Sequence, residues 1–206
     1  MIEYYQEASG KLIAATVEHL QLAGFSLFLA LIAASLITLL LHFVPRLQGL
    51  SVYVLSLLYA VPSFAFFALL IPLTGLGRTT AIIVLVAYAQ YSLVRTFLAG
   101  LSQVDASVKE AAIGMGMTPW QVFWKIELPL SLPAIFAGIR LAGTSIIAIA
   151  TIAVTINAGG LGTILFDGLR TMSLPKLLWG ILLTVGISLL LHLTLYLVEE
   201  LLKPSN

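Results

Sequence analysis

Charged residues are spread unevenly along the chain, and long apolar stretches lie between them. No Asp, Glu, Lys or Arg occurs in four ranges: 19–45, 47–77, 141–166 and 177–198. A fifth apolar stretch, 79–101, is interrupted only by Arg95 near one end. A helix needs about 20 consecutive apolar residues to cross the hydrocarbon core of a bilayer. The pattern therefore predicts membrane-spanning helices near residues 20–43, 51–73, 79–101, 133–157 and 177–198.

Composition agrees with this pattern and narrows the class of protein. Hydrophobic residues make up 60% of the 206 residues and charged residues only 9%, whereas soluble domains carry about 25% charged residues. So few charges exclude a soluble enzyme, a nucleic-acid-binding protein and a disordered chain. The net charge of +1 favours no class of charged partner, and the sequence contains no cysteine for disulfides or thiolate metal sites. We therefore expect an all-α integral membrane protein surrounded by the lipid bilayer.

The segment before the first predicted span is more polar than the spans. Residues 1–18 contain Glu3, Glu7 and Glu18, and they lack the basic cluster that begins a cleaved signal peptide. Apolar residues recur there at loosely helical spacing, which is typical of a short amphipathic helix lying in the membrane interface. A partly ordered polar tail is the alternative. Either interpretation separates an interfacial or external segment, 1–18, from a transmembrane domain, 19–200.

An odd number of spans places the two termini on opposite sides of the membrane. The loops on the C-terminal side contain these basic residues: Arg46, Arg95, Lys109, Lys125, Arg140 and Lys203. The loops on the N-terminal side contain fewer: Lys11, Arg78, Arg170 and Lys176. Because cytoplasmic loops carry an excess of Lys and Arg, the comparison predicts an external N-terminus. It places the C-terminus and the loop 102–132 in the cytoplasm.

This cytoplasmic loop is the most highly charged part of the chain, and it contains signals for two short helices. Asp105 or Ser107 can cap the first helix, and the glycines of Gly114–Gly116 permit the left-handed turn that ends it. Thr118 can cap the second, because proline follows directly and glutamine lies three residues after the cap. Leu128–Pro129 is predicted to end that helix. Helix–helix connections usually span about 2–8 residues, so a loop of this length indicates a docking element.

Seven residues of this loop stand at the following positions: Glu110, Ala111, Ala112, Gly116, Ile126, Leu128 and Pro129. Their spacing resembles the cytoplasmic EAA motif of ABC importer permeases at every position, and we call residues 102–132 the EAA loop. The resemblance implies that these residues couple the chain to an ATPase subunit, with the first helix seated in a groove of that subunit. The small alanines would allow close approach, and Gly116 would reverse the chain. The alternative is a solvated Glu110 and a glycine that only ends a helix.

Four further segments carry a second resemblance: Val61-Pro62-Ser63, Ile71–Gly77, Gly138-Ile139-Arg140 and Ala158–Gly162. They resemble the permeases for glycine betaine, carnitine and choline. The last segment is shared with methionine-type importers and does not discriminate between the two groups. Asn157 departs from the pattern, because relatives often have glycine at that position. Together with the EAA loop, the resemblance covers most of the chain, from about Glu18 to the last span.

The resemblance implies the permease subunit of a type I ABC importer for compatible solutes such as glycine betaine, choline or carnitine, working by alternating access. Five spans supply half of a pathway, so it also implies a second permease, identical or paralogous. Two ABC ATPase subunits and an extracytoplasmic solute-binding protein complete the implied assembly. The sequence contains no Gly-x-x-x-x-Gly-Lys-Ser/Thr phosphate loop. ATP and Mg²⁺ are therefore expected on the ATPase, with no cofactor and no enzymatic activity on this chain.

Two other functions fit the same features. An importer for methionine or another amino acid is the alternative within the same class. A membrane scaffold or sensor, which docks a cytoplasmic partner through the EAA loop without transporting a solute, is the alternative from a different class. Genes for an ATPase and a solute-binding protein next to this one would favour transport.

Two groups of residues are candidates for the pathway and its gate. Pro62 and Pro72 interrupt the second span, and broken helices in membranes face protein or a water-filled cavity. Ser63 and Thr74 would then line that cavity, with a simple packing kink as the alternative. The external loop Gly159–Leu174 and the residue pair before it contain the gate candidates Asn157, Gly159, Gly160 and Gly162. An ordinary connector is the alternative for that loop.

Ionisable and aromatic residues inside the spans are interpreted as structural. Arg95 and Arg140 lie near the predicted cytoplasmic ends, where long side chains reach the headgroups or pair with the EAA loop. His42 and His192 are expected at the interface rather than in a proton relay, because no carboxylate within the spans accompanies them. The aromatic residues are scattered and form no cage for a quaternary ammonium group. Substrate recognition is therefore expected mainly on the binding protein, and no metal site is expected.

Overall fold

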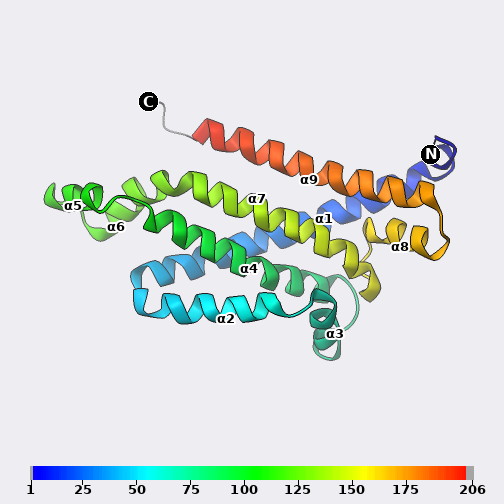
Figure 1. Ribbon diagram of the computed structural model, residues 1–206, viewed down its shortest axis with the longest axis horizontal. Coiled ribbons are helices and arrows are strands. Elements are labelled where there is room, and N and C mark those ends of the chain that lie inside the picture. Colours follow the sequence, from blue (N-terminus) through cyan, green and yellow to red (C-terminus); the bar gives the residue numbers. More distant parts are fainter. Residues whose placement is uncertain (1, 203–206) are drawn as a thin grey trace.

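The computed structural model describes residues 2–202, and every regular element in that range is a helix (Figure 1). The helices are α1 (Ile2–Phe43), α2 (Gln48–Ala60), α3 (Ser63–Thr74), α4 (Arg78–Ser102), α5 (Ala106–Gly114), α6 (Pro119–Val122), α7 (Leu128–Ile152), α8 (Gly162–Arg170) and α9 (Leu174–Leu202). Short 3-10 turns cover Pro45–Leu47 and Ala153–Ile156, and a π-helical turn covers Phe123–Glu127. Four helical segments, containing α1, α4, α7 and α9, are long and apolar enough to cross a membrane. The predicted all-α membrane fold is confirmed.

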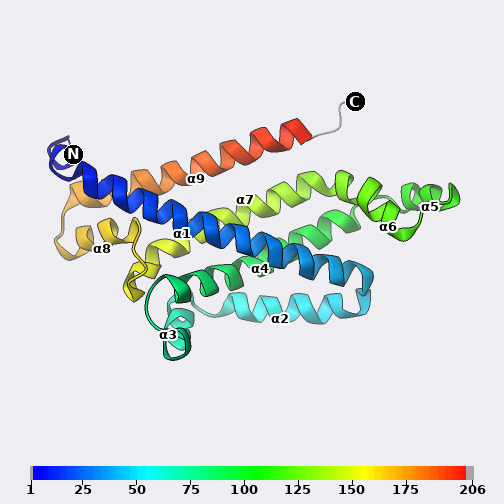
Figure 2. The same ribbon diagram turned by 180° about the vertical axis from the view of Figure 1, so that it is seen from behind.

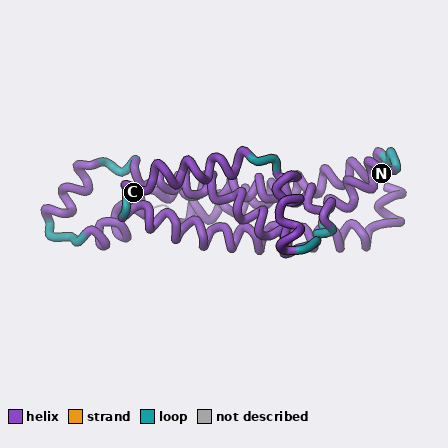
Figure 3. Tube along the Cα trace, turned by 90° about the horizontal axis from the view of Figure 1, so that it is seen from below, coloured by secondary structure: helices purple, strands orange, loops and turns teal. Residues whose placement is uncertain are grey.

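Three long helices, α1, α4 and α7, form the centre of the bundle. α4 packs along both of the others, α9 lies against α7, and α2 lies against α4 (Figures 1 and 2). Seen from below, the long helices follow one common axis (Figure 3). α5 and α6 lie at one end of this axis, whereas α3, α8 and the start of α1 lie toward the other (Figure 1). The EAA loop is therefore separated from α8 by the length of the spans.

Small residues allow α4 and α7 to approach each other closely. A Cβ atom added to Gly100 of α4 would lie 2.8 Å from the Cβ atom of Ala134. A Cβ atom added to Gly138 of α7 would collide with the hydroxyl of Thr96. Such close contact stabilises helix pairs in membranes, where the lipid chains are as apolar as the side chains and no hydrophobic driving force remains. The most extensive helix pair of the bundle is thus set by glycine and alanine.

The start of the chain differs from the prediction. Residues 2–18 are neither a separate helix nor a tail, because they form the first part of one helix that continues to Phe43. At about 1.5 Å per residue, the 42 residues of α1 extend well beyond the roughly 30 Å of a hydrocarbon core. Leu12 and Ala15 are buried, and the ring of Tyr5 stacks on Trp179 of α9 at 5.3 Å. Packing against α9 orders a segment whose charges suggested a boundary.

The predicted second span, 51–73, is broken into two helices that meet at an angle of 95°. Val61 is extended, with ψ of 129°, as expected for the residue before a proline. Pro62 then precedes the first residue of α3. The hydroxyl of Tyr88 donates a hydrogen bond to the Val61 carbonyl, so the carbonyl released by the break has a partner. Pro72 lies inside α3 without interrupting it, and the break predicted there is wrong.

The second helix of the EAA loop does not end at Leu128–Pro129, and that prediction is wrong. The chain stays helical from α6 through the π turn into α7, which begins at these two residues. The Leu128 N–H bonds to the Phe123 carbonyl, five residues earlier. A wider turn accommodates the ring of Pro129, which lacks an N–H and clashes with the preceding turn of an ordinary α-helix. The fourth span is therefore continuous with the EAA loop.

Candidate functional site

Local hydrogen bonds fix the two short helices of the EAA loop. Of the two predicted caps for α5, Asp105 is used, because its carboxylate accepts a hydrogen bond from the Ser107 N–H at 2.8 Å. The same bond holds the pKa of Asp105 below its ordinary value. Thr118 and Gln121 form the predicted capping box of α6, with bonds of 2.9 and 3.3 Å. Between the helices Gly116 has a φ of +88°, a conformation that favours glycine.

α5 presents both polar and apolar groups to the outside of the chain. Glu110 and Ala111 are exposed, and the side chains of Ile113 and Met115 are exposed to 57% and 77%. Ala112 is fully buried within the chain. Of the two alanines in the motif, only Ala111 is therefore available to a partner. Exposed apolar side chains rimmed by polar groups are typical of protein-interaction surfaces.

A buried carboxylate joins the EAA loop to α1. Glu127 of the π turn is 5% exposed, and its two oxygens pair with Lys109 Nζ of α5 at 2.7 Å and with His42 Nε2 of α1 at 2.9 Å. We call these three residues the Glu127 cluster. His42 thus has an acidic partner that was not predicted from the sequence, because Glu127 lies in the EAA loop, outside the predicted spans. The sequence offered one signal for this cluster, a glutamate placed between the apolar motif residues Ile126 and Leu128.

Four aromatic rings extend this junction: Phe43, Trp120, Phe123 and Trp124. The centroids of the contacting rings are 5.2 to 6.0 Å apart. Phe123 is buried between the other rings, whereas both tryptophans are about half exposed. Because Phe43 ends α1, these rings hold the EAA loop against the first span.

The last three motif residues lie apart from the exposed surface of α5. Ile126, Leu128 and Pro129 are half-buried in the π turn and at the start of α7. Leu128 lines an apolar cavity of about 530 Å³ between α1, α4 and α7. The structure thus divides the motif into an outward part on α5 and an inward part that leads into the fourth span.

The four pathway candidates lie around the two ends of α3. Pro62 and Ser63 lie at the break between α2 and α3, whereas Pro72 and Thr74 lie at the opposite end of α3. The Thr74 hydroxyl shares a hydrogen bond of 2.6 Å with the hydroxyl of Thr80 in α4. Thr74 therefore helps to fix the turn into α4. The assignment of these four residues to the pathway stays a prediction.

The four gate candidates lie in or next to the turn between α7 and α8, where Gly160 and Gly162 pack against α1 and α7. Asn157, Gly159 and Gly160 have φ values of 64°, 81° and 81°. Asparagine tolerates this region better than most residues, which explains why Asn157 can replace a glycine. The Gly160 N–H donates to Glu18 Oε2 of α1 at 3.0 Å, and a Cβ atom on Gly162 would collide with the backbone of α7. Packing accounts for these glycines, and a gating role stays a prediction.

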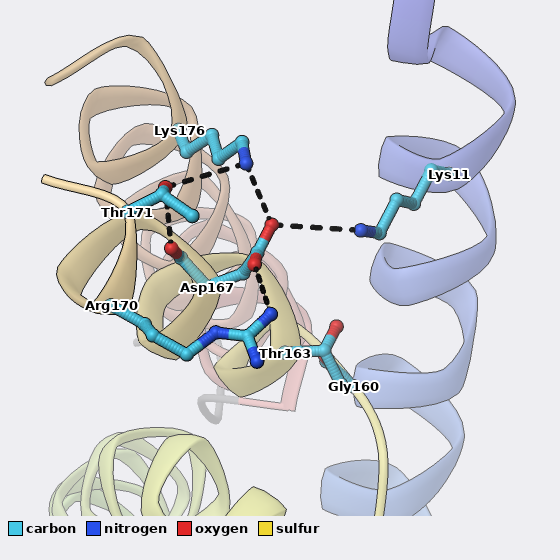
Figure 4. Close-up of polar contacts among 7 residues, drawn as sticks. All are labelled: Lys11, Gly160, Thr163, Asp167, Arg170, Thr171 and Lys176. Carbon is cyan, nitrogen blue, oxygen red and sulfur yellow. Dashed lines mark hydrogen bonds and ion pairs between the residues drawn. The ribbon is translucent and has the colours of Figure 1, made fainter. Parts of the chain in front are cut away.

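The rest of the predicted external loop contains α8, which one carboxylate ties to neighbouring helices (Figure 4). Asp167 pairs with Lys176 of α9 at 2.8 Å and with Arg170 at 3.2 Å. Lys11 of α1 approaches the same carboxylate at 3.8 Å. Hydrogen bonds from Lys176 and Arg170 hold the pKa of Asp167 below its ordinary value. We call these four residues the Asp167 cluster. Its ion pairs hold α8 against α1 and α9, so this region is a packed helix.

Two arginines within the spans have different partners. Arg140 of α7 pairs with the buried Glu199 of α9 at 2.5 Å, so the expectation that it reaches the headgroups or the EAA loop is wrong. Arg95 of α4 is exposed, and its guanidinium donates to the Tyr91 hydroxyl at 2.6 Å. The guanidinium carbon lies 5.7 Å from the centroid of the same ring. Arg95 is therefore held by a phenol rather than by a carboxylate.

Aromatic residues of the spans are not all scattered, as the sequence suggested. Tyr59 at the end of α2 lies 5.8 Å from Tyr88 and 5.1 Å from Tyr91 of α4, measured between ring centroids. Phe66 of α3 lies 5.8 Å from Tyr88. The break between α2 and α3 brings these rings together, because it turns both helices onto α4.

Comparison with known proteins identifies related chains. Residues 26–205 match the family described as binding-protein-dependent transport system inner membrane component. The carnitine transport permease protein OpuCB of Listeria monocytogenes is 35% identical over 205 residues, which cover 100% of this chain and 94% of that protein. The glycine betaine/carnitine/choline transport system permease protein OpuCB of Bacillus subtilis (strain 168) is 29% identical over 206 residues, covering 100% of this chain and 95% of that protein.

A solved structure shares the fold. A chain of the MetNI methionine ABC transporter, in an inward-facing conformation, superposes on this chain with a TM-score of 0.85. The superposition covers 94% of this chain and 96% of that chain. The two sequences are 19% identical, so the likeness concerns the fold alone. The predicted fold of an ABC importer transmembrane subunit is confirmed.

Proposed function

This chain belongs to the family of binding-protein-dependent transport system inner membrane components, and we propose that it is the permease subunit of an ATP-driven importer for small quaternary ammonium solutes. Glycine betaine, carnitine and choline are the expected substrates, because relatives that match over nearly their full length are named for them. The likeness to the methionine transporter is one of fold at 19% identity. This likeness gives no comparable support to methionine as the substrate.

The EAA loop is the observation that carries this proposal. Its helix α5 exposes Glu110, Ala111 and neighbouring apolar side chains, as a docking surface requires. A separate cytoplasmic ATPase would receive α5 in a groove and would bind ATP and Mg²⁺. The chain itself would bind neither and would carry no catalytic residue.

Two connections would transmit a movement of α5 to the spans. The Glu127 cluster ties α5 to the end of α1, and the continuous helix through the π turn leads directly into α7. Removing one partner from a buried ion pair costs about 3–5 kcal/mol, so the first connection resists being pulled apart. Closure of the ATPase pair would then rotate α1, α4 and α7 together and open the pathway outward.

A complete transporter would need further subunits. This chain would supply half of the pathway, and a second copy or a paralogue would supply the other half. Two ATPase subunits would bind, one at the EAA loop of each permease. An extracytoplasmic solute-binding protein would dock at the α8 end, where the N-terminus also lies. The EAA loop and the C-terminus would be cytoplasmic.

Reconstitution of the chain with its ATPase and binding protein in proteoliposomes tests the proposal. We expect uptake of labelled glycine betaine that requires both ATP and the binding protein. Excess unlabelled carnitine or choline should compete with the label, whereas methionine should not. An assembled complex that hydrolyses ATP but imports none of these solutes would support the scaffold alternative. Competition by methionine alone would support the amino-acid alternative.

A further inference from the structure

A cavity lies beside the tyrosines and the arginine within the spans. Its volume is about 270 Å³, and Tyr59, Tyr91, Arg95, Thr96 and Leu141 line it. Pockets for drug-sized ligands usually measure about 300–1,000 Å³, so this cavity suits a smaller solute. Three elements contribute to it, namely α2, α4 and α7. Its lining combines two aromatic rings, one cation and the aliphatic hydroxyls of Ser92 and Thr96.

The cavity lies on the face of the bundle that is turned away from α1. α1 passes behind α4 and α7 in Figure 1 and in front of them in Figure 2. On the α1 side, the Gln90 amide of α4 donates to the Ala30 carbonyl of α1 at 3.2 Å. α2, α4 and α7 remain accessible from the opposite side. A solute could therefore reach the cavity without displacing a helix of this chain.

Arg95 is the feature of the cavity that packing explains least. It lies seven residues before the end of α4, about 10 Å along the helix at 1.5 Å per residue. Within residues 2–202 no carboxylate pairs with it, whereas Arg140 and Lys109 each have one. An ionisable side chain inside a membrane span indicates a functional site unless a partner neutralises it. Its phenol partner leaves most of its hydrogen-bond donors free for a ligand.

The two kinds of group in the cavity match the two charged groups of one ligand class. A quaternary ammonium group has no N–H to donate, and aromatic faces bind it through cation–π attraction. A guanidinium binds a carboxylate through two parallel hydrogen bonds. The guanidinium carbon lies 5.7 Å from the Tyr91 ring centroid, a cation–π contact within the chain. Both groups line the cavity together with Tyr59, so one small molecule can contact all three. Thr96 adds a hydroxyl, although its own hydrogen atom points to the carbonyls of Ser92 or Leu93.

We propose that this cavity is a transit site for zwitterionic quaternary ammonium solutes, with the ammonium group against Tyr59 and Tyr91 and the carboxylate on Arg95. The proposal rests on the proposed function and adds a substrate site within the spans. Arg95 would act as a specificity residue. Glycine betaine and carnitine carry a carboxylate, whereas choline does not. The positive charge of Arg95 would therefore favour the first two over choline.

Such a site would bind its solute weakly. Two aromatic residues, Tyr59 and Tyr91, line the cavity, whereas a complete aromatic cage would enclose the ammonium group on more sides. Weak binding suits a transit site, because a solute that is held tightly would not leave toward the cytoplasm. High affinity would still belong to the binding protein, and the cavity would add a second selection step during passage.

Substitutions at the two ends of the cavity test this proposal in the complete reconstituted transporter. Tyr59→Leu removes a ring face, and we expect maximal uptake of glycine betaine and of choline to fall about five- to tenfold. Arg95→Gln removes the partner of the carboxylate. We expect it to lower maximal uptake of glycine betaine about tenfold and to leave choline uptake unchanged or raised. The ratio of the two uptake rates is therefore the decisive readout.

Matched controls separate recognition from folding. Tyr59→Phe keeps the ring face and should restore most of the uptake of both solutes that Tyr59→Leu loses. Tyr53→Leu changes a tyrosine of the same helix that is 60% exposed, and it should have no effect. Arg95→Lys keeps the charge without the two parallel donors, so it should restore part of the preference for glycine betaine. Every variant is compared at equal ATPase association and equal affinity of the binding protein.

The outcomes distinguish this proposal from the proposed function. If the wild-type complex imports neither solute, the proposed function fails, and this site fails with it. If the wild type imports both and Arg95→Gln keeps the wild-type ratio of glycine betaine to choline, the site is wrong while the function stands. If Tyr59→Leu does not assemble, the Arg95 variants decide the question alone, because they alter an exposed side chain.

Discussion

Both ends of the bundle use one carboxylate to tie a short helix to α1, but in different surroundings. At the EAA-loop end, Glu127 joins α5 to the last residues of α1 through Lys109 and His42. At the other end, Asp167 joins α8 to the first part of α1 through Lys11, with Lys176 and Arg170 beside it. The Glu127 side chain is 7% exposed and the Asp167 side chain 20%. The cations differ more, because Lys11 and Arg170 are largely exposed.

Burial therefore determines how firmly each carboxylate holds its short helix to α1. Water and salt screen an exposed ion pair, and such a pair contributes little to stability. Separating a buried carboxylate from its partners costs much free energy, because its charge would remain in a medium of low dielectric constant. We infer that the EAA loop is joined stiffly to α1, as coupling to an ATPase requires. α8 is held more loosely, as suits the proposed docking surface for a binding protein.

The largest expected effect is an all-or-none difference in labelling between the two ends. The sequence contains no cysteine, so single cysteines can be introduced on a clean background. Ser9→Cys, near the start of α1, should react with a membrane-impermeant thiol reagent in intact cells. Ser107→Cys, in the exposed part of α5, should react only after the cells are opened. Labelling of Ser107→Cys from outside would reverse the orientation and remove the EAA loop from the cytoplasm.

Glu127→Ala should have the next largest effect, because it leaves Lys109 and His42 without an acidic partner. We expect the free energy of unfolding to fall by about 3 kcal/mol, measured by thermal unfolding of the purified complex, together with a loss of uptake. Glu110→Ala is the matched control in the same loop. Glu110 is exposed and makes no ion pair within residues 2–202, so its loss should weaken ATPase association without changing stability. Equal stability of the two variants would contradict the stiff connection.

Gly116→Val should disturb the turn between α5 and α6. No atom lies within 4 Å of an added Cβ, so the whole cost comes from the φ of +88° and amounts to about 1–2 kcal/mol. We expect the chain to insert in the membrane and bind ATPase, with uptake reduced because α5 is misplaced. Gly114→Ala is the control, since that site is also open and lies at the end of a helix, where alanine is favoured. Loss of uptake in both variants would point to crowding rather than to the turn.

Asp167→Asn should have the smallest effect, with a pH dependence of its own. The pKa of Asp167 is lowered by hydrogen bonds from Lys176 and Arg170, so its ionised form is favoured in the folded state. The carboxylate therefore contributes its stabilisation above the ordinary Asp pKa of about 3.9 and loses it as the pH falls through the lower folded value. The melting temperatures of wild type and variant should differ slightly at pH 7 and converge in stronger acid. A difference in melting temperature that is independent of pH and of salt would contradict an electrostatic role for Asp167.

The sequence alone located the spans and the local structure of the EAA loop. Residues 79–101 became α4, and Asp105 and Thr118 cap the two short helices as predicted. These features depend on runs of apolar residues and on hydrogen bonds between residues two or three positions apart. Both can therefore be recognised within a short stretch of sequence. The seven motif residues, from Glu110 to Pro129, could be identified in the same way, from their spacing along the chain.

Only the tertiary structure decided which polar groups meet and which way each helix faces. His42 and Glu127 lie on helices far apart in the sequence, as do Arg140 and Glu199. The spans are apolar around most of their circumference, so periodicity does not reveal how a helix is rotated in the bundle. For the same reason Ala112 could not be distinguished from Ala111, although one is buried and the other exposed. Those choices depend on which neighbouring helix covers each face, and that is fixed by the packing of the bundle as a whole.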